Sequence, residues 1–235
     1  MSNCFTFAGK SSKDFKVYIS GQGTYNAPAR VYSSYEIPGR SGDLFVDEKR
    51  YSNTDLTYPA FIFNDMKKNL EGFRSFLLSR KGYQRLEDTY HPDEFRMAIF
   101  KEDFEADIDQ RHEVATFDIV FNCKPQRFLK SGEKTYTLTS SGSIRNPTDF
   151  ESKPLIRVYG NGTVGIGSQS ITLTGTTNYT DIDCEMMDCY YETENRNSKV
   201  VFTNYDFPVL LPGVNNISLG NGITKVEITP RWWRL

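Results

Sequence analysis

Three carboxylates at two-residue spacing are the first candidates for chemistry in this sequence. Asp181, Asp183 and Glu185 alternate along the segment DIDCE and would project from one face of a β-strand. Such a set could supply a general acid and base, or oxygen ligands for a hard cation. A glycoside hydrolase also needs its carboxylates in a cleft with aromatic platforms, which spacing alone does not establish. Because a solvated strand face gives the same alternation, we predict no catalytic residues here and no enzyme.

The segment GNGTVG, residues 160–165, matches the glycine spacing of a dinucleotide-binding loop. It follows a predicted strand, but the next residues, IGSQSITLTG, indicate another strand and no helix. Without a helix N-terminus there are no free amides to receive a pyrophosphate. We therefore interpret these glycines as hairpin-turn residues and predict no cofactor.

Cysteine and histidine offer little for metal or nucleophilic chemistry. Cys4 and Cys123 stand alone, while Cys184 and Cys189 lack a second pair that would complete a tetrahedral zinc site. The two histidines, His91 in a proline turn and His112 in a charged run, belong to no nucleophile motif. We expect four structural thiols in a reducing compartment and no metal site.

Two adjacent tryptophans, Trp232 and Trp233, lie between arginines in RWWRL. Tryptophan and arginine are enriched in interface hot spots, and tryptophan also stacks on sugar rings. Alternatively, one indole faces a core and the other is packed by arginine stems. We keep both tryptophans as candidate partner or glycan contacts.

A turn-rich segment, EIPGRSGDL (residues 36–44), lies between two predicted strands. Pro38, Gly39 and Gly42 surround Arg40, and a glycine at positive φ would suit a hairpin loop. The residue types by themselves indicate no more than that loop.

In the first part of the chain, the elements predicted from the sequence are mostly strands. FKVYISG, ARVYSSYEIP and DLFVDEKRYS are short β-type runs broken by glycine and proline. One amphipathic helix is predicted from Asn64 or Asp65, as its N-cap, to about Arg80, followed by Gly82. GYQRLEDTY and FRMAIFKEDFEADI form a predicted hairpin around Pro92 and Asp93, and HEVATFDIVFNCKP is a strand expected to end at Pro125.

Composition changes after residue 133. Charged residues are concentrated before Lys134, whereas the later part is rich in Thr, Asn and Gly. Its strand-like runs recur at regular spacing, which is typical of a β-sandwich; they are PLIRVYG, SITLTG, YTDIDCE, KVVFTN, NISLG and KVEITPRWW. We therefore predict a mainly β fold with domains at 1–133 and 134–235.

Charge and hydropathy exclude several classes of function. The 28 basic and 30 acidic residues leave a net charge of -2, so there is no basic footprint for nucleic acid. No segment approaches the roughly 18 apolar residues of a membrane helix. The start of the chain lacks the apolar run of a signal peptide, so we expect synthesis in the cytoplasm without export.

In their order along the chain, several segments resemble the distal tail protein family of long-tailed, non-contractile phages of Gram-positive hosts. The N-terminal pattern contains Phe5, Phe7, Gly9, Ser12 and Phe15. The remaining segments are IPGRSGDL, the helix with GYQRLEDTYHPDEFRMA, FNCKPQRFLKSGE, NPTDFESKPLIRVYGNGT, DIDC and FPVLLPGVNNISL. The resemblance covers essentially the whole chain.

The resemblance implies a structural virion protein of the tail tip, usually a hexameric ring. Its N-terminal domain would build the ring, and its C-terminal domain would be a galectin-like β-sandwich. Phe121 and Cys123 would be buried, Pro125 would end the ring domain's last strand, and Ser131 and Gly132 would turn the chain. A closed ring needs two different patches per subunit, and we take Pro38, Gly39, Arg40 and Gly42 as one.

The implied partners are further copies of this chain, the major tail protein and the tail-associated tip protein, with receptor-binding proteins as a further option. DNA would only pass through the lumen, and the protein would contact no membrane. The alternative from another class is a carbohydrate-binding module that contacts host wall glycans.

Overall fold

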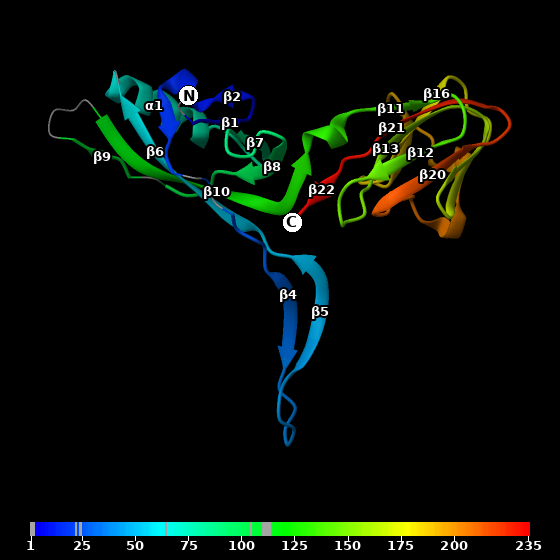
Figure 1. Cartoon of the computed structure of the whole chain (residues 1–235), viewed down its shortest axis with the longest axis horizontal. Coiled ribbons are helices and arrows are strands. Elements are labelled where there is room, and N and C mark those ends of the chain that lie inside the picture. The colour runs from blue at the N-terminus through cyan, green and yellow to red at the C-terminus, as the bar shows by residue number, and fades with distance from the viewer. Residues whose placement is uncertain (1–2, 22, 24, 64, 104, 110–113) are drawn as a thin grey trace. The chain divides into compact units, whose positions relative to one another are not determined.

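A computed structural model describes residues 3–21, 23, 25–63, 65–103, 105–109 and 114–235 (Figure 1). The chain folds into two compact units: unit 1 runs to residue 127 and includes Leu235, and unit 2 comprises residues 128–234. The boundary expected from composition, after residue 133, falls just inside unit 2. Among the described residues there is one α-helix and many strands, so the predicted mainly β class is confirmed.

Unit 1 is built on a curled sheet with the strand order β2-β1-β7-β8-β10-β6-β3. Asn3 forms an isolated bridge to Ile19 of β3, so the chain just before β1 meets the far edge of the same sheet. The strands are β1 (Phe5–Phe7), β2 (Lys10–Ser11), β3 (Val17–Ile19), β6 (Thr54–Phe63), β7 (Gln84–Asp88), β8 (Glu94–Ile99), β9 (Asp107–Ile108) and β10 (Val114–Leu129).

Alternation of apolar and polar residues decides which face of this sheet is buried. β6 and β10 pair antiparallel, from Thr54 opposite Cys123 to Phe63 opposite Val114. Every second side chain joins one aromatic-rich core, including Phe121 and Cys123, whose predicted burial is confirmed. The same core contains Phe5 and Phe7 from the N-terminal pattern.

The helix α1 (Met66–Leu78) closes this core with Met66, Phe73, Phe76 and Leu77. The helix and its start after Asp65 are confirmed, but it ends slightly earlier than predicted. It ends two residues before Arg80, and the αL glycine, Gly82, lies beyond its end. Asp65 is the N-cap residue but is itself left-handed, and its side chain makes no capping bond; Asn64 lies outside the described residues.

The prediction that the last strand of unit 1 ends at Pro125 is wrong. β10 continues to Leu129 before a 3-10 turn at Lys130–Glu133, which confirms the expected turn at Ser131 and Gly132. Pairing between β10 and β6 stops at Cys123. Because this pairing has already ended, the missing N–H of Pro125 costs no hydrogen bond to β6, and the φ that the proline ring imposes is compatible with an extended chain.

β4 (Arg30–Tyr35) and β5 (Leu44–Tyr51) form a separate two-stranded sheet (Figure 1). Tyr35 pairs with Leu44, and Arg30 pairs with Tyr51 across an irregularity in the register. None of these residues belongs to either hydrophobic core. We call residues 30–51 the arm.

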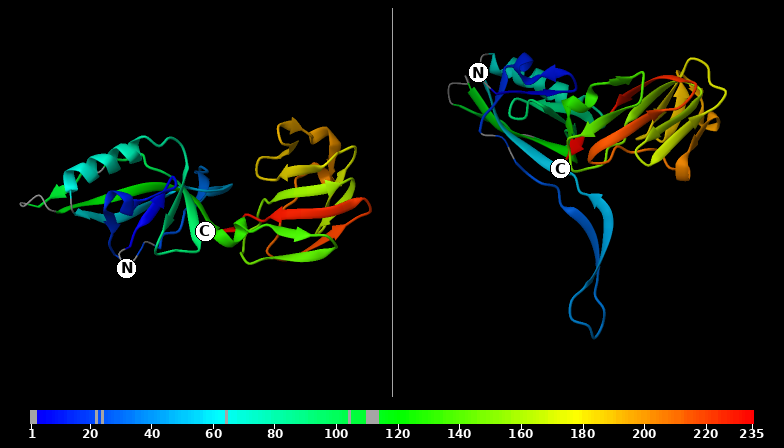
Figure 2. Two further views of the ribbon diagram at one scale, coloured as in Figure 1. Left: turned by 90° about the horizontal axis from the view of Figure 1, so that it is seen from above. Right: turned by 45° about the vertical axis from the view of Figure 1, so that its right-hand side comes forward.

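Unit 2 is a sandwich of two antiparallel sheets, visible from two directions in Figure 2. One sheet has the order β11-β21-β13-β16-β17-β18 and the other β12-β20-β14-β15-β19. Their inner faces share a second core, to which Ile156, Val164, Ile182 and Val226 contribute. All six predicted strand runs are strands here.

The bounds of these strands are β11 (Tyr136–Leu138), β12 (Gly142–Asn146), β13 (Leu155–Gly160), β14 (Gly162–Ile166), β15 (Gln169–Leu173), β16 (Tyr179–Asp183), β17 (Asp188–Tyr191), β18 (Glu194–Asn195), β19 (Val200–Phe202), β20 (Gly213–Leu219), β21 (Ile223–Thr229) and β22 (Trp233–Arg234). Short 3-10 turns lie at Asn197–Lys199 and Thr203–Tyr205.

The prediction that the glycines of GNGTVG form a hairpin turn is wrong: Gly160 ends β13 and Gly162 begins β14, and these strands lie in different sheets. The connection between them packs against a second Gly-Asn-Gly turn at residues 220–222. The Asn161 amide donates to the Gly222 carbonyl at 3.2 Å, and the Gly220 amide donates to the Thr163 carbonyl at 2.8 Å. A Cβ on Gly222 would lie 2.1 Å from the Asn161 carbonyl oxygen. These glycines are therefore required by close backbone contact within the sandwich.

Candidate assembly interface

The tip of the arm brings together the four residues proposed for an oligomer interface. The Arg40 amide donates to the Ile37 carbonyl at 3.1 Å, and Gly39, with φ +79°, follows Pro38. Proline followed by a residue at positive φ is the pattern of a type II turn. Gly42 also has positive φ, and all four residues are exposed. The tip is a defined turn whose side chains face solvent.

Large apolar side chains are exposed along the arm. Phe45 is 65% exposed and Leu44 50%, and Val46 continues the run. Tyr32 and Tyr35 on the opposite strand are also exposed, and Tyr32 contacts Phe45 edge-on at 6.3 Å between ring centroids. Contiguous exposed apolar surface of this kind marks interaction sites.

Polar contacts hold the two strands of the arm together. Arg30 donates from Nε to both Asp47 carboxylate oxygens at 3.1 Å, and its guanidinium lies over the Tyr51 ring. The hydrogen bond from Arg30 lowers the pKa of Asp47. Ser34 donates to Asp43 at 2.6 Å nearer the tip. The polar side chains thus stabilise the hairpin, while the apolar ones remain available.

The base of the arm is fixed by a network of amides. Asn53 donates from Nδ2 to the Tyr83 hydroxyl at 2.6 Å and to Asn122 at 2.7 Å. Asn122 donates to the Asp55 carboxylate at 2.6 Å, and Asn26 donates to the Asp55 carbonyl at 2.7 Å. These hydrogen bonds tie the start of β6 to β10 next to the base of the arm.

Two of the three carboxylates of DIDCE, Asp181 and Asp183, are held in ion pairs, while Glu185 is exposed. Asp181 receives two hydrogen bonds from Arg157, at 2.7 and 2.8 Å, and Asp183 receives two from Arg231 at the same distances. Burial opposes ionisation of Asp183, but hydrogen bonds from Arg231 and two backbone amides outweigh it and lower the pKa. A carboxylate kept ionised in this way is a poor general acid.

The two tryptophans occupy different environments. Trp232 is 1% exposed and belongs to the core of unit 2, where its carbonyl accepts from the Leu129 amide. Trp233 is partly buried, stacks on Phe150 at 4.6 Å and donates from its indole nitrogen to the Glu151 carbonyl. Trp232 is therefore the indole that faces the core, as one of the two predicted alternatives has it. Of the two tryptophans, only Trp233 keeps solvent-accessible surface.

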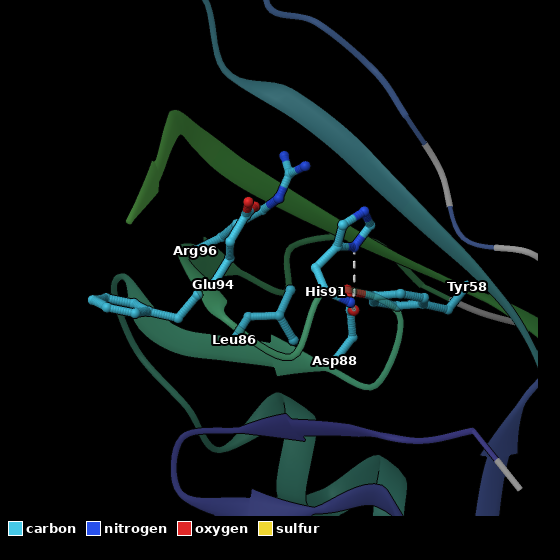
Figure 3. A pocket seen from close by; sticks show the side chains of 7 residues that line it. Tyr58, Leu86, Asp88, His91, Glu94 and Arg96 are labelled. Atoms are coloured by element: carbon cyan, nitrogen blue, oxygen red, sulfur yellow. Dashed lines mark hydrogen bonds and ion pairs between the residues drawn. The ribbon is translucent and has the colours of Figure 1, made fainter. Parts of the chain in front are cut away.

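A small pocket in unit 1 contains His91 (Figure 3); it is lined by Tyr58, Leu86, Asp88, His91, Glu94, Phe95 and Arg96. The Asp88 carboxylate accepts from the Tyr58 hydroxyl at 2.6 Å and from the His91 amide at 2.7 Å, and lies 3.3 Å from His91 Nδ1. Burial, together with the Asp88 charge, raises the pKa of Tyr58 well above its ordinary value. This cluster anchors the predicted turn between β7 and β8, which is confirmed.

All four cysteines are free thiols, and burial raises the pKa of Cys123 and of Cys189 to about 12. His112 lies outside the described residues. Within the described ranges, no three His, Cys, Asp or Glu side chains are grouped as metal ligands, and no helix could span a bilayer.

Sequence reasoning located the arm's tip but missed its apolar strands. The sequence predicts Tyr32, Tyr35 and the run Leu44–Val46 as ordinary strand residues, for which burial in a sheet core is expected. A signal was present, since three consecutive apolar residues in DLFVDEKRYS depart from the alternation of a half-buried strand.

Comparison with known proteins gives a fold likeness over the whole chain. No protein-family model and no curated protein matches the sequence. The solved structure of SPP1 Dit, described as a paradigm of the hub adsorption apparatus in phages infecting Gram-positive bacteria, matches with a TM-score of 0.73 at 14% identity. The match covers 100% of both chains. The chain therefore has the two-unit fold of that protein.

Chains of the phage P2 baseplate in its activated conformation give weaker likenesses. The structure with Ca has a TM-score of 0.49 and the structure with Sr has 0.46, each at 9% identity. Both cover 99% of this chain and 100% of the matched chain.

Proposed function

We propose that this protein is a structural component of a phage tail tip, a distal tail protein whose copies form a ring of six at the end of the tail tube. The observation that carries this proposal is the fold likeness to SPP1 Dit over the full length of both chains. The ordered sequence segments of that family support it independently, because they span both units.

The exposed arm supports a role in assembly. Its tip residues Pro38, Gly39, Arg40 and Gly42, which we propose as one ring contact, are presented on a hairpin that contributes nothing to either core. A protein that acted alone would gain nothing from such exposed apolar surface, which favours aggregation.

In this proposal the ring joins the major tail protein to the tail-associated tip protein, and unit 2 offers Trp233 as a contact for a receptor-binding protein. The protein acts in the virion and is made in the host cytoplasm. A net charge of -2 suits a ring through which DNA passes, because a strongly basic lumen would retain the DNA.

Neither rival class has an observation in its favour. The carboxylates that an enzyme would use, Asp181 and Asp183, are paired with arginines. For a carbohydrate-binding module, Trp232 is buried and one face of Trp233 is covered by Phe150. We therefore propose a non-enzymatic, structural role.

The mass of the purified protein tests the proposal directly. Light scattering coupled to size exclusion, with negative-stain images, should give a species of six 27.0 kDa chains with a central hole. A protein that remains monomeric alone and also fails to join tails assembled with its tube and tip partners would contradict the ring.

A further inference from the structure

The arm is a hairpin whose apolar side chains belong to neither core, and the ring contact between Tyr32 and Phe45 lies within the arm itself. Tyr35, Leu44 and Val46 lie on one face, because Tyr35 pairs with Leu44 and alternate residues of β5 share a face. Tyr32 and Phe45 lie on the other face. An isolated two-stranded hairpin is marginally stable in water, so burial of this surface against a partner would stabilise the arm.

Unit 1 carries a second apolar surface, which we call the aromatic strip: Tyr18 and Phe61, which are half-buried, and Phe63 and Val114, which are exposed. These residues lie on the sheet face opposite the core, since their neighbours Ile19, Ile62 and Ala115 are buried. The register places Phe61 opposite Tyr18 and Phe63 opposite Val114. Phe63 and Val114 are each 37% exposed.

The rings of the aromatic strip are stacked into a flat platform. Ring centroids are 5.2 Å apart for Tyr18 and Phe63, and 5.8 Å apart for Tyr18 and Phe61, with interplanar angles of 16° and 28°. Phe61 and Phe63 complete the set at 6.2 Å. The strip is therefore ordered before any partner binds, which reduces the entropy lost on docking.

We propose that the arm of one copy docks on the aromatic strip of a second copy, and that this contact is the repeated junction of the ring. The inference rests on the proposed function and deepens it by naming both sides of the interface. A closed ring needs two different, complementary patches on each subunit. The arm and the strip are two such patches, and both are apolar.

Charge complementarity supports a second copy of this chain as the occupant. Arg40 is exposed at the arm's tip. Beside the strip, Asp107 and Asp109 are exposed, and Asp109 is tied to Val114 by two hydrogen bonds of 3.0 and 3.2 Å. Docking of the apolar surfaces would bring the cationic tip near these carboxylates.

The dimensions of the arm also suit this contact. β5 has 8 residues, and a strand of that length spans roughly 26 Å. A standard interface takes about 20 to 30 residues from each partner, which residues 30–51 supply on the arm's side. The arm can therefore cover the strip and its acidic border together.

Two variants separate the sides of the junction. Leu44→Asp with Val46→Asp disables the arm, and Phe63→Asp disables the strip; Val114→Lys is a second strip variant should Phe63→Asp unfold the protein. Leu211→Asp, at a 53% exposed apolar residue of unit 2, is the matched control. We expect arm and strip variants to sediment as monomers with the wild-type melting temperature, and the control to assemble like the wild type.

Mixing the two variants gives the decisive result. The arm variant retains a strip and the strip variant retains an arm, so a 1:1 mixture should form a capped heterodimer of about 54 kDa, twice the chain mass of 27.0 kDa, and no ring. Failure of the mixture to pair overturns the proposal, because an arm–arm contact or a different receiving surface must then operate.

Other outcomes distinguish this inference from the proposed function. If the wild type forms rings and the strip variants do so equally well, the ring proposal stands and the strip is not the receiving surface. A wild type that stays monomeric up to its solubility limit, but joins tails assembled with its partners, overturns the arm–strip junction in solution and leaves the tail role intact.

Discussion

At the scale of single residues, the two Gly-Asn-Gly turns show how a sequence motif can reflect packing instead of chemistry. Gly222 has φ +87°, and a Cβ there would lie 2.1 Å from the Asn161 carbonyl oxygen. Gly213 has nearly the same φ, +85°, but a Cβ there would meet nothing within 4 Å. The two positions therefore separate backbone strain from steric overlap.

We predict that Gly222→Ala destabilises unit 2 by about 2–4 kcal/mol, whereas Gly213→Ala costs about 1 kcal/mol, the strain of an alanine in the left-handed region alone. Urea denaturation of both variants measures the difference. Equal losses of unfolding free energy in the two variants would show that the two turns can move apart at little cost, and that their close packing does not stabilise unit 2.

Residue types also explain why the carboxylate hypothesis could not be decided from the sequence. Asp181 and Asp183 alternate in the way that a catalytic pair can, but their partners, Arg157 and Arg231, are 24 and 48 residues away along the chain. The register that places β13 beside β16 brings Arg157 to Asp181. The fold also brings Arg231 back to Asp183, so the structure reveals two separate ion pairs that the sequence does not.

At the scale of elements, the arm is a strand pair that could be removed without touching a core. Arg30 and Tyr51 are partners at its base, so a two-residue Asn-Gly turn can join them. We predict that replacing residues 31–50 by Asn-Gly changes the melting temperature by less than about 3 °C, because no arm residue is in either core.

The same variant should fail to form rings, as judged by light scattering, while its circular dichroism remains that of a β-rich protein. A large loss of thermal stability would show that the arm supports unit 1. Rings that persist without the arm would contradict its role in assembly.

Most elements were predictable because burial of one face of a strand or helix imposes a regular spacing on the apolar residues. β6, β10 and the strands of the sandwich alternate cleanly, and α1 shows Met66, Phe73, Phe76 and Leu77 at helical spacing. The arm was less predictable, because sequence reasoning assigns apolar strand residues to the protein's own core. Leu44 and Phe45 instead face solvent in the single chain.

The end of β10 illustrates a second limit. The sequence predicts that the strand ends at Pro125. The free energy that a proline costs in a strand depends, however, on whether a carbonyl of the neighbouring strand lies opposite its missing N–H. Pairing with β6 ends at Cys123, two residues before Pro125, so Pro125 costs no hydrogen bond to β6. Strand limits near proline therefore depend on tertiary pairing that a single sequence does not reveal.

At the scale of the whole molecule, the balance of forces in the proposed junction predicts how assembly responds to salt. The arm and the strip contribute apolar surface, which salt does not screen, whereas Arg40 and the carboxylates near Val114 contribute an exposed charge pair. Such a pair is worth up to about 1 kcal/mol, or about fivefold in affinity.

We therefore predict that raising NaCl from 0.1 to 1 M weakens the association between copies by no more than about fivefold, measured by analytical ultracentrifugation. Arg40→Ala should remove most of this salt dependence while leaving rings that assemble at higher protein concentration. Ammonium sulfate should strengthen assembly, because excluded salts favour burial of apolar surface. A loss of affinity of a hundredfold or more in NaCl would instead mean that charged surfaces, and not the apolar arm and strip, hold the copies together.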